Sequence, residues 1–313
     1  MISAKLGYDR DLFILPFDHR ASFLEKLFGI KGRVPTDPEA AEVSSYKFII
    51  YEGFKKALER GVPYESAGIL VDEQFGSAIL RDAQLRRIIT AYPVERSGQD
   101  EFDFEYGTRF AEHAERFNPT FVKCLVRYNP EGDVEMNRRQ LSRLKQLSDS
   151  CKKVARKFMF ELLVPATSDQ LKRFGGRVEK YDRDLRPELM MRAMAALQEG
   201  GVEPDVWKLE GIENVEDSER VLLQARAGSG RDRVGVIVLG RGENEEKVRQ
   251  WLSVAAGVKG VIGFAVGRTV FWDALKAAKS GSISGEEASE RIARNYKAFC
   301  DLWISARQSR KVA

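Results

Sequence analysis

The 313-residue chain has little cysteine and little histidine, and both shortages exclude classes of site. Its cysteines, Cys124, Cys151 and Cys300, are odd in number and lack the paired spacing of a zinc site, which indicates a reduced cytoplasmic protein. Only His19 and His113 are present, and His113 falls within an expected helix. A catalytic zinc ion held by several histidines is therefore not expected.

Long apolar runs and a strong net charge are also missing. No run approaches the roughly 18 apolar residues of a membrane span, and residues 1–10 lack the apolar core of a secretory signal. The net charge is +4, from 51 basic and 47 acidic residues that are spread along the chain. Such a charge does not indicate nucleic-acid binding. We expect a cytoplasmic protein that binds neither membrane nor nucleic acid.

Short apolar runs typical of strands alternate with amphipathic helical stretches. The expected strands are 12–17, 67–71, 88–93, 120–126, 157–164, 205–209, 234–239 and 260–266. The expected helices are 38–60, 104–117, 137–155, 187–200, 215–227, 243–256, 271–279 and 285–304, with a weaker connection at 77–87. This alternation predicts an α/β fold, a single (β/α)8 barrel over residues 1–313 with an extra C-terminal helix. A doubly wound sheet would instead show a glycine fingerprint after its first strand, where the chain has Asp18-His19-Arg20.

Three charged residues interrupt consecutive apolar strands, where an ionised side chain is costly. They are Lys123, Glu161 and Lys208. Because side chains alternate along a strand and the apolar neighbours suit outward packing, all three are expected to point into the barrel and converge. An amine beside a second amine and a carboxylate is the chemistry of a Schiff-base enzyme.

Lys208 is the expected nucleophile of this site. A free lysine titrates near 10.4, so imine formation at neutral pH needs its pKa lowered toward about 7. Burial lowers the pKa of a lysine, and the Lys123 cation acts in the same direction. We expect burial to raise the pKa of Glu161, which then moves protons to and from the carbinolamine. A buried lysine–glutamate ion pair without chemistry is the alternative.

Glycine and arginine follow the last two expected strands, where barrels often bind phosphate through backbone N–H groups and a short helix N-terminus. The sequence therefore predicts a phosphate site made of Gly240, Arg241, Gly242, Gly267 and Arg268. Polar residues at the other strand ends are expected to orient the substrate. They are Asp18, Arg20, Asp72, Glu95 and Arg127.

A magnesium site competes with the lysine chemistry. Asp72, Glu95 and Glu161 could supply carboxylate ligands, which suit that ion. This alternative, a Mg²⁺-dependent carboxylate lyase of the same fold, leaves Lys208 and Lys123 without a role. A third possibility is a non-catalytic barrel that binds a sugar phosphate and controls a partner. The preferred interpretation, an aldolase, needs no metal or other cofactor.

Several long motifs of the chain resemble one family. They are residues 12–20 (LFILPFDHR), 68–76 (GILVDEQFG), 97–105 (SGQDEFDFE), 126–133 (VRYNPEGD), 160–166 (FELLVPA), 205–211 (DVWKLEG) and 263–269 (GFAVGRT). Over essentially its whole length the chain resembles the aldolase-like domain found C-terminal to the sugar kinase in bifunctional 5-dehydro-2-deoxygluconokinase proteins of inositol catabolism. It is more distantly similar to class I tagatose-1,6-bisphosphate aldolases.

The resemblance implies specific roles and a specific reaction. Lys208 would form the imine, Glu161 would be the acid and base, Lys123 the neighbouring cation, and Arg268 a phosphate ligand. The implied reaction cleaves 2-deoxy-5-keto-gluconate 6-phosphate into dihydroxyacetone phosphate and malonate semialdehyde. His19 stands where the tagatose aldolases have glutamine, so substrate contacts at this end are expected to differ.

Two further expectations concern partners. The kinase half is not among the 313 residues, so the expectation is that a separate kinase supplies the phosphorylated substrate or that the pathway differs. Barrels of this class often form homo-oligomers, and helix 285–304 is the candidate contact, by analogy of fold.

Overall fold

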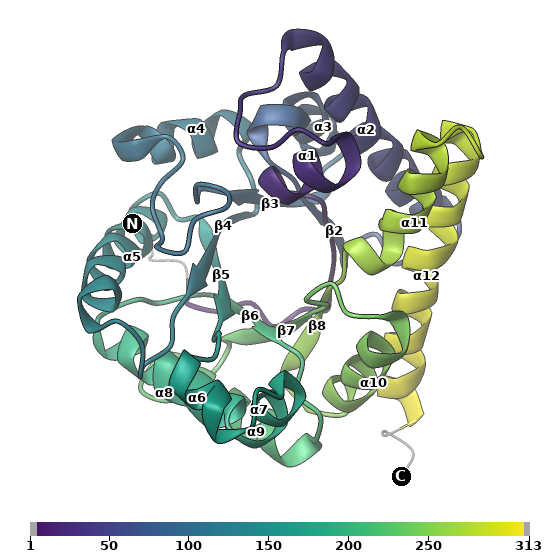
Figure 1. Ribbon diagram of the computed structural model, residues 1–313. Helices are drawn as coiled ribbons and strands as arrows, with labels where there is room; N and C mark the ends of the chain where they lie inside the picture. The colour runs from purple at the N-terminus through teal and green to yellow at the C-terminus, as the bar shows by residue number, and fades with distance from the viewer. Residues whose placement is uncertain (1–4, 310–313) are drawn as a thin grey trace.

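Eight parallel strands close into a barrel in the computed structural model, which describes residues 5–309, and helices surround that barrel (Figure 1). The strands pair in chain order and β1 pairs with β8, so the ring has no open edge. Their bounds are β1 Leu12–Pro16, β2 Ala67–Leu70, β3 Ile89–Pro93, β4 Phe121–Arg127, β5 Lys157–Leu163, β6 Val206–Glu210, β7 Gly235–Leu239 and β8 Val261–Ala265. The predicted single (β/α)8 barrel is confirmed.

The outer layer consists of helices whose apolar faces cover the strands. They are α1 Ala21–Phe28, α2 Asp37–Glu59, α3 Glu73–Leu85, α4 Phe110–Phe117, α5 Val134–Lys153, α6 Ser168–Arg173, α7 Val178–Asp184, α8 Arg186–Glu199, α9 Val215–Ala225, α10 Glu245–Ala256, α11 Arg268–Lys279 and α12 Gly285–Ser309. Local sequence fixes several of their starts. Asp133 caps α5, for example, by accepting a hydrogen bond from the backbone N–H of Met136.

The structure differs from the expected elements in a few places. The helix expected at 104–117 begins only at Phe110, after a short 3-10 turn at Gly107–Arg109. Before it, Phe104 pairs with Glu95 in an antiparallel bridge, which keeps this part of the chain extended. Helices α1, α6 and α7 were not expected, and the weak connection at 77–87 is a helix that begins earlier, at Glu73.

The expected extra C-terminal helix is present as α12. It packs against α2, α10 and α11, and Figure 1 shows it in yellow along the outside of α11. Its Tyr296 hydroxyl donates a 2.6 Å hydrogen bond to the carbonyl of Phe13 in β1, and Trp303 is buried. The apolar face of α12 is therefore buried within its own chain.

The barrel interior is layered in a way that positions the site. Apolar side chains, among them Phe121, Met159 and Val206, fill its lower part. Because positions two apart share a face of a strand, the next inward positions on these strands are Lys123, Glu161 and Lys208. The apolar filling thus forms the floor beneath a layer of charges.

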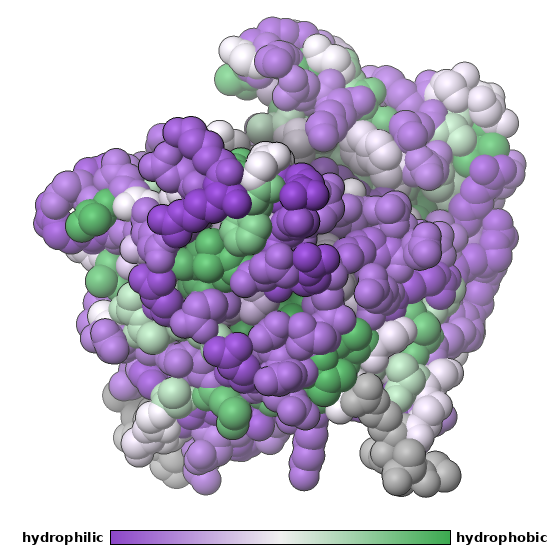
Figure 2. Space-filling model, turned by 60° about the horizontal axis from the view of Figure 1, so that its bottom comes forward, coloured by the Kyte–Doolittle hydropathy of each residue, from purple (hydrophilic) through white to green (hydrophobic). Residues whose placement is uncertain are grey.

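Polar side chains dominate the face of the molecule that Figure 2 shows. The apolar side chains on this face lie in small separate groups. Among the helices in residues 5–309, none combines the length and the apolar character that a bilayer span requires.

Candidate active site

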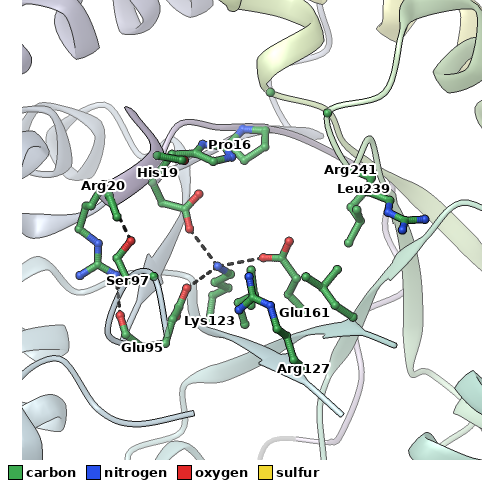
Figure 3. A pocket seen from close by; sticks show the side chains of 18 of the residues that line it. Pro16, His19, Arg20, Glu95, Ser97, Lys123, Arg127, Glu161, Leu239 and Arg241 are labelled. Carbon is green, nitrogen blue, oxygen red and sulfur yellow. Dashed lines mark hydrogen bonds and ion pairs between the residues drawn. The ribbon is translucent and has the colours of Figure 1, made fainter. Parts of the chain in front are cut away.

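A cavity of about 340 Å³ opens at the C-terminal ends of the strands. Side chains from the ends of β1 and of β3 to β8 line it, and the loop after β3 contributes Ser97 to Phe102. Figure 3 shows Glu95, Lys123 and Glu161 pointing toward one another within this cavity. In (β/α)8 barrels this end of the strands carries the chemistry.

Lys123, Glu161 and Lys208 meet inside the barrel, as expected from their places in the strands. The Nζ atoms of Lys208 and Lys123 each lie 2.9 Å from the same oxygen, Oε2 of Glu161. The exposed fractions of the three side chains are 3%, 1% and 9% for Lys208, Lys123 and Glu161. Glu161 and Lys208 are paired directly in the register of β5 and β6, which accounts for their contact.

Lys123 has two further carboxylate partners. Its Nζ lies 2.9 Å from Oδ2 of Asp18 and 2.6 Å from Oε1 of Glu95 (Figure 3). Burial alone would lower the pKa of Lys123, but the attraction of Asp18, Glu161 and Glu95 outweighs it and raises that pKa well above its usual value. Lys123 is therefore a permanent cation.

The pKa values of the three carboxylates are shifted in different directions. Burial tends to raise the pKa of Glu161, but the Lys123 and Lys208 cations outweigh burial and hold it below its usual value. The expectation that burial would raise the pKa of Glu161 is wrong for this reason. The same cations lower the pKa of Asp18 against the effect of burial. Burial and the nearby Asp18 raise the pKa of Glu95, even though Lys123 is close.

His19 is neutral at neutral pH. Burial is the main cause that lowers its pKa to about 4; Asp18 acts against this, and Arg268, Lys208 and Lys47 add to it. Its Nδ1 atom is buried without a hydrogen-bond partner among the described residues. His19 lines the cavity, so a neutral imidazole is available there to a substrate.

The loops after β7 and β8 come together at one side of the cavity. Arg268 is the first residue of α11, and its guanidinium donates a 2.9 Å hydrogen bond to the carbonyl of Arg241. Gly242 has φ +82°, and a Cβ there would collide with the Arg268 guanidinium. A Cβ at Gly267 would collide with the carbonyl oxygen of Pro16. Glycine is thus required for this close approach.

The two arginines of these loops are not equivalent. Arg241 binds Asp182 at 2.5 Å and Glu210 at 3.2 Å, so its charge is neutralised by the protein itself. Within residues 5–309 no carboxylate forms an ion pair with Arg268. The five predicted phosphate residues, Gly240, Arg241, Gly242, Gly267 and Arg268, all line the cavity, and the ion pairs of Arg241 also hold its loop in place.

The structure also sorts the predicted substrate residues. Asp18, Arg20, Glu95 and Arg127 line the cavity. Arg20 pairs with Glu105 at 2.9 Å and donates to the backbone carbonyl of Glu95, so it fastens the loop after β3. Arg127 likewise donates to the carbonyl of Gln99 at 2.8 Å.

Asp72 does not line the cavity, so the prediction that it contacts the substrate is wrong. Its side chain is 1% exposed and pairs with Lys47, and it caps α3 through a 2.9 Å hydrogen bond from the N–H of Phe75. The structure therefore does not bring together Asp72, Glu95 and Glu161, the three carboxylates that were the candidate magnesium ligands. Across residues 5–309, no group of three histidine, cysteine or acidic side chains is placed to hold a metal ion.

Two features of the site were not found from sequence. The loop from Ser97 to Phe102 lines the cavity, although none of its residues was among the predicted site residues. Lys47 lies fully buried behind the first strand, where its Nζ donates to the carbonyl of Phe17 at 2.9 Å. Lysine on an otherwise apolar helix face, between Val43 and Ile50, is a signal of the same kind as Lys208.

Comparison with known proteins gives a family and a fold. A family model described as "Uncharacterized protein conserved in bacteria (DUF2090)" matches residues 2–307. No curated protein sequence matches the chain.

Solved structures share the architecture at low sequence identity. A Corynebacterium glutamicum protein is 20% identical, with a TM-score of 0.58, over 94% of this chain and 88% of that one. The fructose-bisphosphate aldolase of Plasmodium falciparum is 13% identical, with a TM-score of 0.65, over 94% and 91%. A Schiff base-forming fructose-1,6-bisphosphate aldolase is 14% identical, with a TM-score of 0.53, over 91% and 93%. At these identities the likeness shows the barrel fold.

Proposed function

The chain belongs to the bacterial protein family DUF2090, and from the geometry of its site we propose that it is a Schiff-base aldolase that cleaves a phosphorylated keto sugar. One observation carries the proposal. Two buried ammonium groups, those of Lys208 and Lys123, contact a single oxygen of Glu161 inside a barrel cavity. The similarity in fold to a Schiff base-forming aldolase supports it.

The first half of the reaction forms the imine. Ionised Glu161 takes a proton from Lys208, and the free amine attacks the substrate carbonyl to give a carbinolamine. Glu161 returns the proton to the carbinolamine hydroxyl, which leaves as water and produces an iminium ion on Lys208. Lys123 stays charged throughout and keeps Glu161 ready to accept the next proton.

The second half breaks the carbon–carbon bond. Glu161 removes the proton of the substrate hydroxyl; the bond cleaves, an aldehyde forms, and the electron pair moves to the iminium to give an enamine. Glu161 then protonates the enamine carbon, and water releases the ketone and regenerates Lys208. Each proton that Glu161 accepts is given back, so the cycle closes without a cofactor.

The finer substrate proposal rests on the sequence motifs. By resemblance to the aldolase-like domain of inositol catabolism, the substrate is 2-deoxy-5-keto-gluconate 6-phosphate and the products are dihydroxyacetone phosphate and malonate semialdehyde. Arg268 and the glycine loops hold the phosphate, with Asp18, Glu95 and Arg127 facing the rest of the sugar acid. The reaction would take place in the cytoplasm.

Borohydride trapping tests the proposal. Reduction in the presence of the keto-sugar phosphate should leave a covalent adduct on Lys208, located by peptide mass spectrometry. Lys208→Met should abolish both the adduct and the aldol cleavage, whereas Lys276→Met, at a side chain that is 55% exposed, should change neither.

Two results would overturn it. Cleavage that a chelator abolishes and that leaves no adduct would favour the magnesium lyase. Substrate binding that is the same in wild type and Lys208→Met, with no cleavage by either, would favour a non-catalytic sugar-phosphate-binding barrel.

A further inference from the structure

The cluster around Lys123 contains more acidic groups than basic ones. Two ammonium groups, Lys123 and Lys208, contact three carboxylates, Asp18, Glu95 and Glu161. The exposed fraction of each of these five side chains is 11% or less. With all five ionised, the cluster would hold one uncompensated negative charge away from water, which is costly.

We propose that Glu95 is the neutral member of this cluster and that its carboxyl proton is donated in a hydrogen bond to the part of the substrate that leaves as aldehyde. This inference rests on the proposed aldolase function and assigns Glu95 as the donor that recognises an oxygen acceptor, a hydroxyl or carboxylate, on that fragment.

The contacts single out Glu95 among the three carboxylates. Glu161 touches both lysines, so it has the strongest reason to stay ionised. Asp18 touches Lys123 and also feels Lys208 and any charge on His19. Glu95 has Lys123 alone, through Oε1, and its Oε2 is buried without a hydrogen-bond partner among the described residues. The pKa directions agree, since that of Glu95 is raised and those of Asp18 and Glu161 are lowered.

The other charged neighbours do not neutralise Glu95 itself. Arg268 on α11, which has no carboxylate partner among the described residues, acts on Glu161. Arg20 approaches from the end of β1, but its guanidinium donates to the backbone carbonyl of Glu95 rather than to its carboxylate. Glu105, in the loop after β3, pairs with Arg20 and offsets its charge. Arg127, further along β4, is directed to the carbonyl of Gln99.

The place of Glu95 in the ring assigns it to one end of the substrate. The strand order puts Glu95, which follows β3, beside Lys123 in β4, Glu161 in β5 and Lys208 in β6, in turn around the barrel. A substrate bound to Lys208 and reaching toward β3 passes Glu161 first and meets Glu95 with its remote fragment. Because Oε1 accepts from Lys123, the proton belongs on Oε2, a buried atom without a hydrogen-bond partner among the described residues. The substrate has to displace what covers this atom in order to accept its proton.

Two substitutions test the donor role. Glu95→Gln keeps a donor of similar shape, so kcat/KM at pH 7 should fall less than tenfold, whereas Glu95→Ala should lower it roughly 10- to 100-fold further because the hydrogen bond is lost. Wild-type activity should decline as rising pH ionises Glu95, and Glu95→Gln should lack that alkaline decline. Equal losses in the two variants, or an unchanged alkaline limb in Glu95→Gln, would overturn the inference.

Infrared spectroscopy tests protonation without relying on activity. The difference spectrum of wild type minus Glu95→Gln, at pH 7 and without substrate, should contain the C=O stretching band of a protonated carboxylic acid. The matched difference for Glu161→Gln should contain only ionised carboxylate bands, since the pKa of Glu161 is lowered. Absence of the protonated band would overturn the inference, while failed borohydride trapping would overturn the aldolase proposal and leave this band unchanged.

Discussion

Glu161 starts the proposed cycle as a base because of where its two lysines lie. Its oxygen contacts Lys208 and Lys123 at the same distance, 2.9 Å, so it is already ionised when substrate arrives. Proton transfer from Lys208 to Glu161 then yields, in one step, the free amine of Lys208 and the protonated carboxyl group of Glu161, which can act as an acid. Lys123, held charged by three carboxylates, prevents Glu161 from picking up a proton from solvent instead.

Replacement of this base should be severe for catalysis. Glu161→Gln cannot accept a proton, and we expect kcat/KM to fall by roughly 10²- to 10⁴-fold, the usual contribution of acid–base catalysis. Because the pKa of Glu161 is lowered, the wild-type acid limb should lie below the ordinary glutamate range. Steady-state kinetics against pH measure both effects, with Glu188→Gln, at a half-exposed side chain, as the control. Full activity in Glu161→Gln would contradict its role.

His19 should titrate far below an ordinary histidine. Only two histidines are present, so Nε2- and Cε1-detected NMR of wild type and His113→Gln identifies its signal, with an expected pKa of about 4. A folded-state pKa below the unfolded value of about 6.5 makes stability complete above pH 6.5 and reduces it as pH falls toward 4.

The lowered pKa of His19 should make the protein less stable at pH 5 than at pH 7. Between pH 7 and pH 5 the unfolded chain binds a proton at His19 that the folded protein does not, which costs about 1–2 kcal/mol. Urea denaturation at the two pH values should therefore show a smaller loss in His19→Asn than in wild type. An equal loss in both proteins would contradict a buried neutral imidazole.

At the residue scale, sequence identified the charged groups but not their ionisation. Lys123, Glu161 and Lys208 were predicted because each interrupts an apolar strand. The lowered pKa of Glu161 depends on two distances of 2.9 Å that no sequence pattern provides. Asp72 was placed wrongly because its partner, Lys47, comes from a helix 25 residues earlier in the chain.

The Lys47–Asp72 pair connects three elements behind the site. Lys47 belongs to α2, Asp72 caps α3, and Lys47 also binds the carbonyl of Phe17 at the end of β1. The ammonium lies 5.6 Å from the ring centres of both Phe23 and Phe75, so it is enclosed by aromatic side chains. The pair therefore fixes the position of the backbone just after β1, where Asp18 and His19 follow.

Removal of the Lys47 charge alone should lower the free energy of unfolding more than removal of both charges of the pair. Lys47→Met leaves an uncompensated buried carboxylate, and we expect it to lower the free energy of unfolding by about 3–5 kcal/mol. The double variant Lys47→Met with Asp72→Asn should lose less than Lys47→Met alone, because no charge remains buried. Urea denaturation measures the three proteins, with Lys55→Met as the partly exposed control on α2. A double variant that loses as much stability as Lys47→Met, or more, would contradict a buried ion pair.

At the element scale, periodicity predicted every strand and most long helices. It failed where tertiary contacts decide the backbone: the chain near Phe104 stays extended because it bridges Glu95. It also missed α1, α6 and α7, which are eight residues or shorter and carry too few turns for a helical period to appear. Of these elements, the start of α1, at Ala21 and Ser22, and the loop after β3 line the cavity, so part of the least predictable structure lies at the site.

At the scale of the whole molecule, the C-terminal helix α12 packs against elements from the first part of the chain, namely α2 and, through Tyr296, β1. Its buried face packs on α2 and α11, and its polar residues include the exposed pairs Glu287–Arg291 and Lys297–Asp301. The expected homo-oligomer stays a prediction. A contact through α12 would have to use this charged face, because its apolar face is already buried in the same chain.

The closed ring predicts one cooperative unfolding transition in which α12 takes part. Tyr296→Phe removes the hydrogen bond to the Phe13 carbonyl and should lower the free energy of unfolding by about 1–2 kcal/mol. Tyr64→Phe, at a 45% exposed side chain that also donates to a backbone carbonyl, should cost less than about 0.5 kcal/mol. Far-UV circular dichroism and tryptophan fluorescence, with Trp207 in β6 and Trp303 in α12 as reporters, should give coincident urea transitions in both variants. Separate transitions would mean that α12 detaches before the barrel opens, and the bond between Tyr296 and β1 would then stabilise only the helix.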